Sequence, residues 1–141
     1  KIEHLGKVII GDDVELGSNC SIDRGSVGDT HLDDQVKLDN DVHLAHNVHV
    51  GRASVIAANT TVAGSTTIGK NCTISGGCGI IDNLIITDSV HITALSLVTK
   101  SITKSGTYTS GTPLMEHSLW KRNAVAFKRL KDLIKNNIWQ N

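Results

Sequence analysis

Aliphatic side chains recur at every sixth position along most of this chain. From Leu32 to Val98, twelve successive positions at that spacing are all Leu, Ile or Val. The same step joins Ile10, Leu16 and Ile22, and one longer step of ten residues separates Ile22 from Leu32. A helix would turn residues six apart by about 120° to different faces, and a simple strand would need apolar residues at every second position. The period therefore indicates neither an ordinary helix nor an ordinary strand.

An all-β solenoid of short strands satisfies this period. If each six-residue unit forms one strand and one turn, three units close a triangular coil, and residues one coil apart stack on each other. About five coils would extend over roughly 25 Å. The residue after the aliphatic is often glycine, as at Gly11 and Gly51, and is expected to form the tight corners. A second inward row of small or branched residues lies two positions before the aliphatics: Val8, Val14, Cys20, Thr30, Val36, Val42, Val48, Ser54, Thr60, Thr66, Cys72, Cys78, Leu84, Val90 and Ser96.

The repeat ends at Lys104 and divides the chain. Residues 1–104 are predicted to form the solenoid, residues 105–117 a turn-rich linker, and residues 118–141 an amphipathic helix with Ser118 as its N-cap. Apolar side chains follow this helix at helical spacing, with basic side chains around them. Two interpretations stay open: the helix packs on its own solenoid or on sister subunits, or its basic side chains dock an acidic partner.

Charge is divided unevenly between these segments. Residues 1–117 hold 8 basic and 13 acidic side chains, whereas residues 118–141 hold 6 basic and 1 acidic, so that the total is neutral. This balance excludes a protein that coats nucleic acid. No apolar run approaches the roughly 20 residues of a membrane-spanning helix, and the amino terminus does not resemble a signal peptide. We expect a soluble cytoplasmic protein with no membrane span.

Cysteine and histidine supply the candidate metal ligands. All three cysteines fall in the small inward row, which favours buried packing in a reducing compartment over disulfides or metal binding. His43, His46 and His49 have zinc-like spacing, but His43 and His49 are expected on neighbouring faces, too far apart to share one ion. Convergence between subunits is the remaining route to a zinc site, and no second histidine pair supports it. We predict no metal.

Several motifs resemble a family of hexapeptide-repeat acyltransferases, which form left-handed parallel β-helices and are usually homotrimers. The motifs are S-I-D-R-G at 21–25, L-D-N at 38–40, L-A-H-N-V at 44–48, A-G-S at 63–65 and T-S-G-T-P-L at 109–114. They are similar to the UDP-3-O-(3-hydroxyacyl)glucosamine N-acyltransferases of lipid A biosynthesis. Asn47 favours this family over the related O-acyltransferases, which typically have A-H-D. The resemblance implies an enzyme that moves a 3-hydroxyacyl chain from acyl carrier protein to the 2-amine of UDP-3-O-acyl-glucosamine.

The resemblance also implies a reaction centre of three residues. His46 matches the family's catalytic base, which takes the proton of the sugar amine. Asp39 matches the carboxylate that orients this imidazole. Gly64, one expected coil after His46, matches the residue whose backbone N–H stabilises the oxyanion. No bound cofactor is implied, since the acyl donor is the phosphopantetheine arm of the carrier. The alternative for His46 is a corner histidine that only bonds to a neighbouring coil.

Further residues are implied to bind substrate or carrier. The expected substrate contacts are Asn40, Asn47 and Asn83, of which the last replaces a second histidine of the family. The expected acyl-groove residues are Leu95, Leu97 and Thr99, which should give a chain-length preference different from that of methionine-bearing relatives. The residues expected to meet the acidic carrier are Lys121, Arg122 and Lys128.

Other expectations concern the extent of the protein and its competing functions. The repeat is already in phase at Val8 and Ile10, so we expect the chain to be cut from a longer protein with further coils upstream. The family's amino-terminal uridine-binding domain has no counterpart in this sequence, which implies that this segment alone binds the nucleotide sugar poorly. One alternative is another hexapeptide-repeat acyltransferase. The other is a non-catalytic scaffold or ice-binding solenoid, suggested by the doublets Thr60-Thr61 and Thr66-Thr67, although these are expected on adjacent faces.

Overall fold

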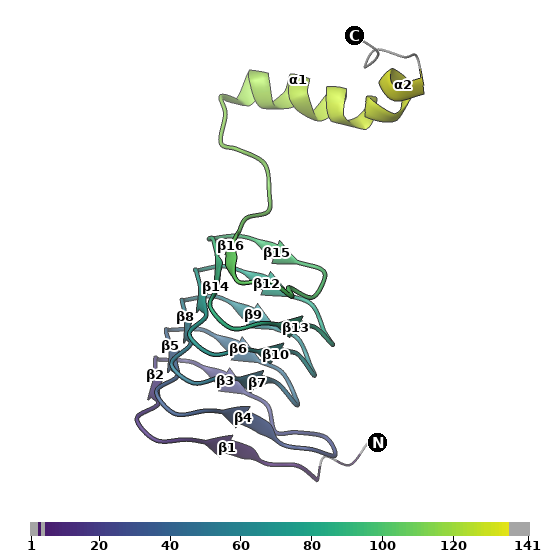
Figure 1. Cartoon of the computed structure of the whole chain (residues 1–141). Coiled ribbons are helices and arrows are strands. Elements are labelled where there is room, and N and C mark those ends of the chain that lie inside the picture. Colours follow the sequence, from purple (N-terminus) through teal and green to yellow (C-terminus); the bar gives the residue numbers. More distant parts are fainter. Residues whose placement is uncertain (1–2, 4, 136–141) are drawn as a thin grey trace. The chain divides into compact units, whose positions relative to one another are not determined.

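The computed structural model describes residue 3 and residues 5–135 of the chain. It divides into two compact units, Lys1–Gly111 and Thr112–Asn141. The first unit contains all the strands, stacked coil upon coil (Figure 1).

The strands form three parallel sheets. Sheet A contains β1 (Val8–Ile10), β4 (Thr30–Leu32), β7 (His49–Val50), β10 (Thr67–Ile68) and β13 (Ile85–Ile86). Sheet B contains β2 (Glu15–Leu16), β5 (Lys37–Leu38), β8 (Val55–Ile56), β11 (Thr73–Ile74), β14 (Val90–Ile92) and β16 (Gly106–Tyr108). Sheet C contains β3 (Ser21–Ile22), β6 (His43–Leu44), β9 (Thr61–Val62), β12 (Gly79–Ile80) and β15 (Leu97–Val98).

Strand register confirms the predicted coil. His49 pairs with Thr67 and so lies 18 residues from its neighbour in the sheet, which is three six-residue units. Between β1 and β4 the offset is 22 residues, because Val8 pairs with Thr30. The four extra residues belong to the loop at 24–29, where the sequence repeat has its longer step. This loop leaves the coil without shifting the sheets that follow.

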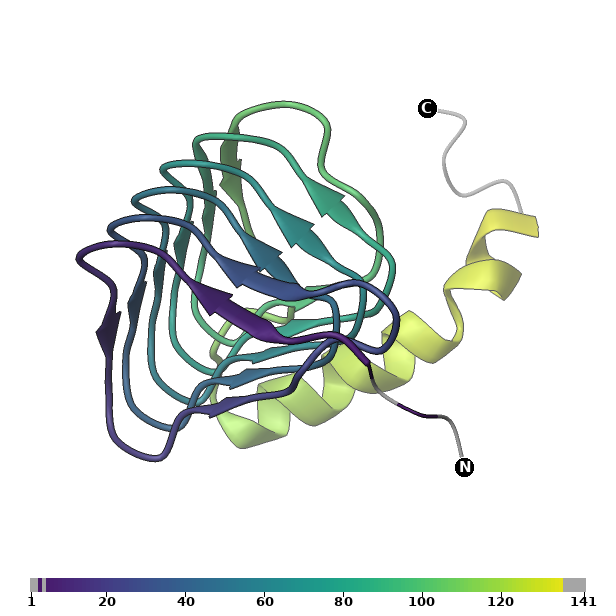
Figure 2. The ribbon, with the colours of Figure 1, turned by 90° about the horizontal axis from the view of Figure 1, so that it is seen from below.

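The solenoid is left-handed. Seen from the amino-terminal end, the chain passes anticlockwise from β1 to β2 and β3 while it recedes from the viewer (Figure 2). The chain therefore turns from sheet A to B, from B to C and from C back to A in every coil. We call the three lines of corners the A–B, B–C and C–A edges.

The two predicted rows fill the interior. All twelve aliphatics from Leu32 to Val98 are buried, and so are the small residues from Thr30 to Ser96. Burial of each large aliphatic contributes about 1.5–3 kcal/mol. The first coil is less covered, since Ile10 and Leu16 remain 47% and 45% exposed.

Inward hydroxyl groups use hydrogen bonds between coils. Thr60 Oγ1 donates to the carbonyl of Ser75 at 3.1 Å and accepts the N–H of Cys78 at 3.3 Å. Ser54 Oγ and Thr66 Oγ1 make the equivalent pairs of bonds. These side chains are therefore buried without losing their polar partners.

The corners differ from the prediction. The left-handed backbone conformation falls three residues after most of the aliphatics, as at Asn47 (φ 61°) and Ser65 (φ 60°), and not on the glycine that directly follows an aliphatic. Asn and Asp are common there because a short polar side chain tolerates this conformation better than a bulky one. The corner signal in the sequence is thus the row of Asn, Asp and Ser residues.

The carboxyl-terminal boundaries also need correction. Strand β16 pairs with β14, and Ile102 bridges to Ile86, so the coil continues past Lys104 into the predicted linker. Helix α1 (His117–Lys128) begins after Glu116, not Ser118, and helix α2 (Leu130–Lys135) follows a break at Arg129. The predicted helical residues 136–141 lie outside the described part of the chain.

Glu116 replaces Ser118 as the N-cap because its carboxylate reaches the first turn. It accepts hydrogen bonds from the N–H groups of Ser118 and Leu119, and also from the Ser118 hydroxyl. This hydrogen bonding holds the pKa of Glu116 below its ordinary value. Neither described helix has the length and apolar character that a bilayer crossing requires.

Candidate functional site

The C–A edge brings His46 and Gly64 together. Strands β6 and β9 pair in register, so the turn after one lies directly beside the turn after the other. The N–H of Ser65 donates to the carbonyl of His46 at 2.9 Å. A Cβ atom on Gly64 would lie 2.6 Å from Cε1 and 2.7 Å from Nε2 of His46. The imidazole therefore packs against the Gly64 backbone, in space that a side chain would occupy.

The backbone N–H of Gly64 differs from those of its neighbours. The N–H of Ala63 donates to Ile80 at 2.9 Å, and that of Ser65 donates to His46. Among the described residues, the Gly64 N–H has no acceptor. An N–H without a partner, beside an imidazole, is chemically suited to bind a developing oxyanion.

Asn47 is held within the chain, although the sequence analysis expected it to contact substrate. Its Oδ1 lies 3.0 Å from Nδ1 of His46 and accepts hydrogen bonds from Ser26. Its Nδ2 donates to the carbonyl of Gly28 at 2.9 Å. Both ends of the amide are thus engaged by His46 and by the loop at 24–29.

Asn83 shares the C–A edge. Its N–H donates to the carbonyl of Gly64 at 3.0 Å, so Asn83 lies one coil beyond Gly64 and two coils beyond His46. The Asn83 side chain donates from Nδ2 to Oδ2 of Asp82 at 2.6 Å. Asn83, which replaces the family's second histidine, therefore lies on the same edge as His46, and its side-chain amide is bonded to the Asp82 carboxylate.

Asp39 and Asn40 lie on a different edge from His46. They follow β5 of sheet B and sit on the B–C edge, whereas His46 follows β6 of sheet C. Asp39 Oδ1 accepts the N–H of Asn40 at 2.8 Å, and Asn40 Oδ1 accepts the N–H of Ser18 at 2.8 Å. Asp39 and His46 are therefore not neighbours within one chain, and the support of the His46 imidazole by Asp39 stays a prediction. One whole face of six residues, roughly 20 Å of extended chain, separates the two turns.

The three clustered histidines point to separate parts of the prism. His43 lies in sheet C with its Nε2 3.8 Å from Asp23, and His49 lies in sheet A with its Nε2 2.8 Å from Asp33. His46 occupies the edge between these sheets. Among the described residues, no three His, Cys, Asp or Glu side chains gather as metal ligands.

The cysteines and threonines named in the sequence analysis are packing residues. Cys72 and Cys78 are buried, and desolvation raises the pKa of both thiols. Cys20 is half-buried in the first coils. The doublets split, because Thr60 and Thr66 are buried while Thr61 and Thr67 belong to sheets C and A. No flat threonine face results.

The expected acyl-groove residues occupy two positions on the outside of the solenoid. Leu95 is a corner residue of the B–C edge and is 78% exposed. Its side chain lies over Gly77, where a Cβ would be 2.6 Å from Cδ2 of Leu95. Leu97 projects from sheet C above Gly79 in the same way, with 3.3 Å from such a Cβ to its Cδ1. The two leucines border Gly77 and Gly79, which we call the glycine strip.

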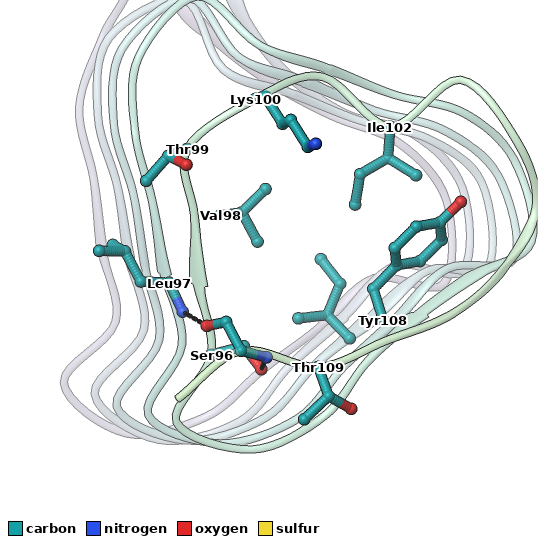
Figure 3. Close-up of a pocket in the computed structure, with 10 residues that line it drawn as sticks. Ser96, Leu97, Val98, Thr99, Lys100, Ile102, Tyr108 and Thr109 are labelled. Carbon is teal, nitrogen blue, oxygen red and sulfur yellow. Dashed lines mark hydrogen bonds between the residues drawn. The ribbon is translucent and has the colours of Figure 1, made fainter. Parts of the chain in front are cut away.

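A separate pocket of about 230 Å³ opens at the carboxyl-terminal end of the solenoid interior. Leu97 and Thr99 are among its lining residues, and Leu95 is not. Val98, Ile102 and Tyr108 point into the pocket, whereas Leu97 points away from it (Figure 3). The pocket is therefore the incompletely filled end of the core and not the outer strip bordered by Leu95 and Leu97.

The expected carrier-binding side chains lie on α1. Lys121, Arg122 and Lys128 are all exposed. Lys121 and Lys128 are seven residues apart, so they lie on the same side of the helix. Leu119 and Trp120 of the same helix are about half exposed, at 41% and 45%.

Sequence reasoning did not identify Ser26 and Thr30 as parts of this site. The N–H and hydroxyl of Ser26 both reach Asn47, and Thr30 Oγ1 accepts the Asn47 N–H at 2.9 Å. The available signal was the ten-residue step in the repeat, which lies one coil before His46. An insertion at that point necessarily leaves the coil beside the C–A edge.

Comparison with known proteins identifies similar chains. No protein-family profile matches the sequence. The UDP-3-O-acylglucosamine N-acyltransferase of Chromohalobacter salexigens is 50% identical over 135 residues, which is 96% of this chain and 39% of that protein. The enzyme of the same name from Acinetobacter baylyi is 56% identical over 133 residues, covering 94% of this chain and 37% of that protein. The chain thus spans about two-fifths of the length of these relatives.

Solved structures support the fold. The UDP-N-acetylglucosamine acyltransferase of Arabidopsis superposes with a TM-score of 0.73 at 22% identity, over 91% of this chain and 46% of that one. LpxA from Acinetobacter baumannii superposes with a TM-score of 0.71 at 24% identity, over 95% of this chain and 55% of that one. The resemblance inferred from the motifs and the predicted solenoid are both confirmed.

Proposed function

We propose that this chain, whose sequence matches the UDP-3-O-acylglucosamine N-acyltransferases over nearly its whole length, carries the acyl-transfer site of an enzyme of that kind. The reaction moves a 3-hydroxyacyl group from acyl carrier protein to the 2-amine of UDP-3-O-acyl-glucosamine in lipid A biosynthesis. The observation that carries this proposal is the contact of the His46 imidazole with Gly64 on the C–A edge.

The two residues supply complementary parts of the chemistry. The sugar amine attacks the thioester carbonyl while neutral His46 takes its proton. The carbonyl oxygen becomes an oxyanion, which the N–H of Gly64 stabilises by a hydrogen bond. Collapse of the tetrahedral intermediate breaks the carbon–sulfur bond, and the imidazolium returns a proton to the departing phosphopantetheine thiolate. Amide and thiol are formed, and His46 ends neutral.

The role of Asp39 requires a second chain. Since Asp39 and His46 lie on different edges of one solenoid, the Asp39 carboxylate can approach the His46 ring and stabilise the imidazolium by its charge when the B–C edge of one subunit meets the C–A edge of the next. Such unlike surfaces meet repeatedly around a closed ring. We therefore propose a homotrimer with a reaction centre at each of its interfaces.

The remaining roles follow from position. Asn83 on the C–A edge and Asn40 on the B–C edge would border the same interface from its two sides and contact the UDP-sugar. The acyl chain would lie along the glycine strip, with Leu95 and Leu97 limiting its length and Thr99 at the end of β15. The donor needs no cofactor bound to this chain, because the phosphopantetheine arm arrives on the carrier.

The basic side chains of α1 are proposed to bind the carrier. Acyl carrier protein is acidic, so replacement of Lys121, Arg122 and Lys128 by Glu would repel it and raise the KM for the carrier. Steady-state kinetics at several salt concentrations measure this effect, since the wild-type KM should rise with ionic strength. An unchanged carrier KM in the triple variant would remove this surface from the proposal.

Turnover of acylated carrier by the His46→Ala variant tests the function. We expect the rate to fall on the order of 10²- to 10⁴-fold, as for loss of a general base. His91→Ala is the matched control, because His91 projects from sheet B, away from the C–A edge. His46 is exposed, so circular dichroism should show an unchanged solenoid. Near-normal turnover by His46→Ala would refute the base role.

A further inference from the structure

We infer that Asn47, anchored by the loop at 24–29, is a positioning residue that holds His46 in the tautomer with its proton on Nδ1. This inference rests on the proposed function of His46 as the base. Asn47 would then act within the protein and not on the substrate. The loop, which leaves the solenoid one coil before His46, would serve to anchor the Asn47 side chain.

The orientation of the Asn47 amide is fixed by its partners. Oδ1 accepts the N–H of Ser26 at 3.1 Å and the Ser26 hydroxyl at 2.7 Å. Nδ2 donates to the carbonyl of Gly28 at 2.9 Å. A flipped amide would turn its N–H₂ group toward the Ser26 N–H and its oxygen toward the Gly28 carbonyl, so the hydrogen bonds to these two backbone groups would be lost. The loop therefore determines which atom of Asn47 faces His46.

That atom determines the protonation of the ring. Oδ1 of Asn47 lies 3.0 Å from Nδ1 of His46, and an amide oxygen can only accept a hydrogen bond. Nδ1 must then carry the hydrogen, and the lone pair of the neutral ring lies on Nε2. Nε2 is also the ring nitrogen closer to the Gly64 position, at 2.7 Å from a Cβ built there compared with 3.1 Å for Nδ1. The basic nitrogen is thus on the side of the proposed oxyanion donor.

The backbone of Asn47 is fixed as firmly as its side chain. Its left-handed conformation, with φ at 61°, turns the side chain toward the loop. Its N–H donates to Oγ1 of Thr30 at 2.9 Å, and that hydroxyl donates to the carbonyl of Asp23 at 2.7 Å. Thr30, which directly follows the loop and is buried, therefore also holds Asn47.

This arrangement has a functional consequence. A free neutral imidazole exchanges its proton between the two nitrogens, so only part of the population would present a basic Nε2. An acceptor fixed at Nδ1 keeps the ring in one tautomer and one orientation, and it stabilises the imidazolium that forms during transfer. Loss of Asn47 should therefore lower kcat more than it changes KM.

The direct test is NMR spectroscopy of protein labelled with ¹⁵N-histidine, without substrate. The His46 signals are identified by their loss in His46→Gln. In the wild type, at a pH where the ring is neutral, we expect the pattern of a ring protonated on Nδ1. In Asn47→Ala, we expect both tautomers, together with a kcat about tenfold lower and a KM within twofold of the wild-type value.

Two further variants separate this role from a general structural one. Asn71→Ala places alanine at an equivalent left-handed corner, with φ at 53°, on the A–B edge, so it shares any backbone cost and should leave the His46 spectrum unchanged. Asn47→Asp keeps an acceptor at Nδ1 and adds a negative charge, so it should retain the tautomer and shift the acid limb of the kcat/KM profile to higher pH.

The outcomes distinguish this inference from the proposed function. A wild-type spectrum with the proton on Nε2, or an Asn47→Ala spectrum identical to the wild type, would overturn the role of Asn47 even if His46 were essential. Full activity of His46→Ala would instead refute the proposed function, while the spectrum would still report whether Asn47 sets the tautomer.

Discussion

At the scale of single residues, the site depends on the absence of one side chain and the conformation of another. Gly64 leaves room for the His46 ring. Asn47 accepts the Nδ1–H of His46 and occupies a corner with a left-handed backbone conformation. The glycine was foreseeable, because residues 18 apart stack in a solenoid of period six. The contacts of Asn47 could not be foreseen, because Ser26 and Gly28 belong to the loop at 24–29, and the six-residue period does not predict where loop residues lie.

Gly64→Ala tests the close contact directly. The added methyl group would lie within 3 Å of two ring atoms, so the imidazole must move away. We expect turnover to fall on the order of tenfold or more, and stability to fall by about 1–3 kcal/mol, as for other overpacked sites. Urea unfolding and single-turnover kinetics measure the two effects.

A double-mutant cycle supplies the control for this substitution. In a His46→Ala background the ring is absent, so Gly64→Ala should cost clearly less stability than in the wild type. An equal cost in both backgrounds would mean that alanine clashes with something other than the imidazole.

At the scale of elements, strands were better determined by the sequence than the helix ends. Each strand from β4 to β15 is fixed by two buried inward residues, such as Val42 and Leu44. The start of helix α1 depends instead on which nearby side chain accepts hydrogen bonds from the free N–H groups of the first turn. Ser118 was the expected cap, but the longer Glu116 side chain reaches those groups from outside the helix and brings a negative charge to its positive end.

The cap of α1 should respond to pH. The pKa of Glu116 is lowered in the folded protein by its hydrogen bonds, so its contribution to helix stability is present above the ordinary pKa of a glutamate and is lost as pH falls through the lowered value. The amide proton signals of Ser118 and Leu119 should shift together over that acidic range. In Glu116→Gln these shifts should be absent, and their persistence would show that another group titrates there.

At the scale of the whole molecule, the reaction centre is divided between edges. His46, Gly64 and Asn83 share the C–A edge, whereas Asp39 and Asn40 lie on the B–C edge. Seven residues separate Asp39 from His46 in the sequence, yet they belong to turns at two corners of the prism. Close spacing along the chain was therefore a poor guide to proximity, while the 18-residue spacing of His46 and Gly64 was a good one.

Mixing two inactive variants tests the proposed trimer. Asp39→Ala and His46→Ala homotrimers should each have low activity. After unfolding and refolding together in equal amounts, about a quarter of the interfaces should combine an intact His46 from one subunit with an intact Asp39 from the next, as cyclic symmetry requires. Activity should return to roughly that fraction. If both residues act from the same chain, no mixed interface regains a complete site and activity stays low.

The sequence alone determined the solenoid, its three sheets, the two buried rows and the stacking of His46 on Gly64. It could do so because every coil repeats the same inward positions, and a repeat converts spacing along the chain directly into position in space. Tertiary structure decided the rest: the separation of Asp39 from His46, the hold of the loop on Asn47 and the cap at Glu116. These depend on where a chain turns and on which side chains reach across a non-repeating segment, and no period records such contacts.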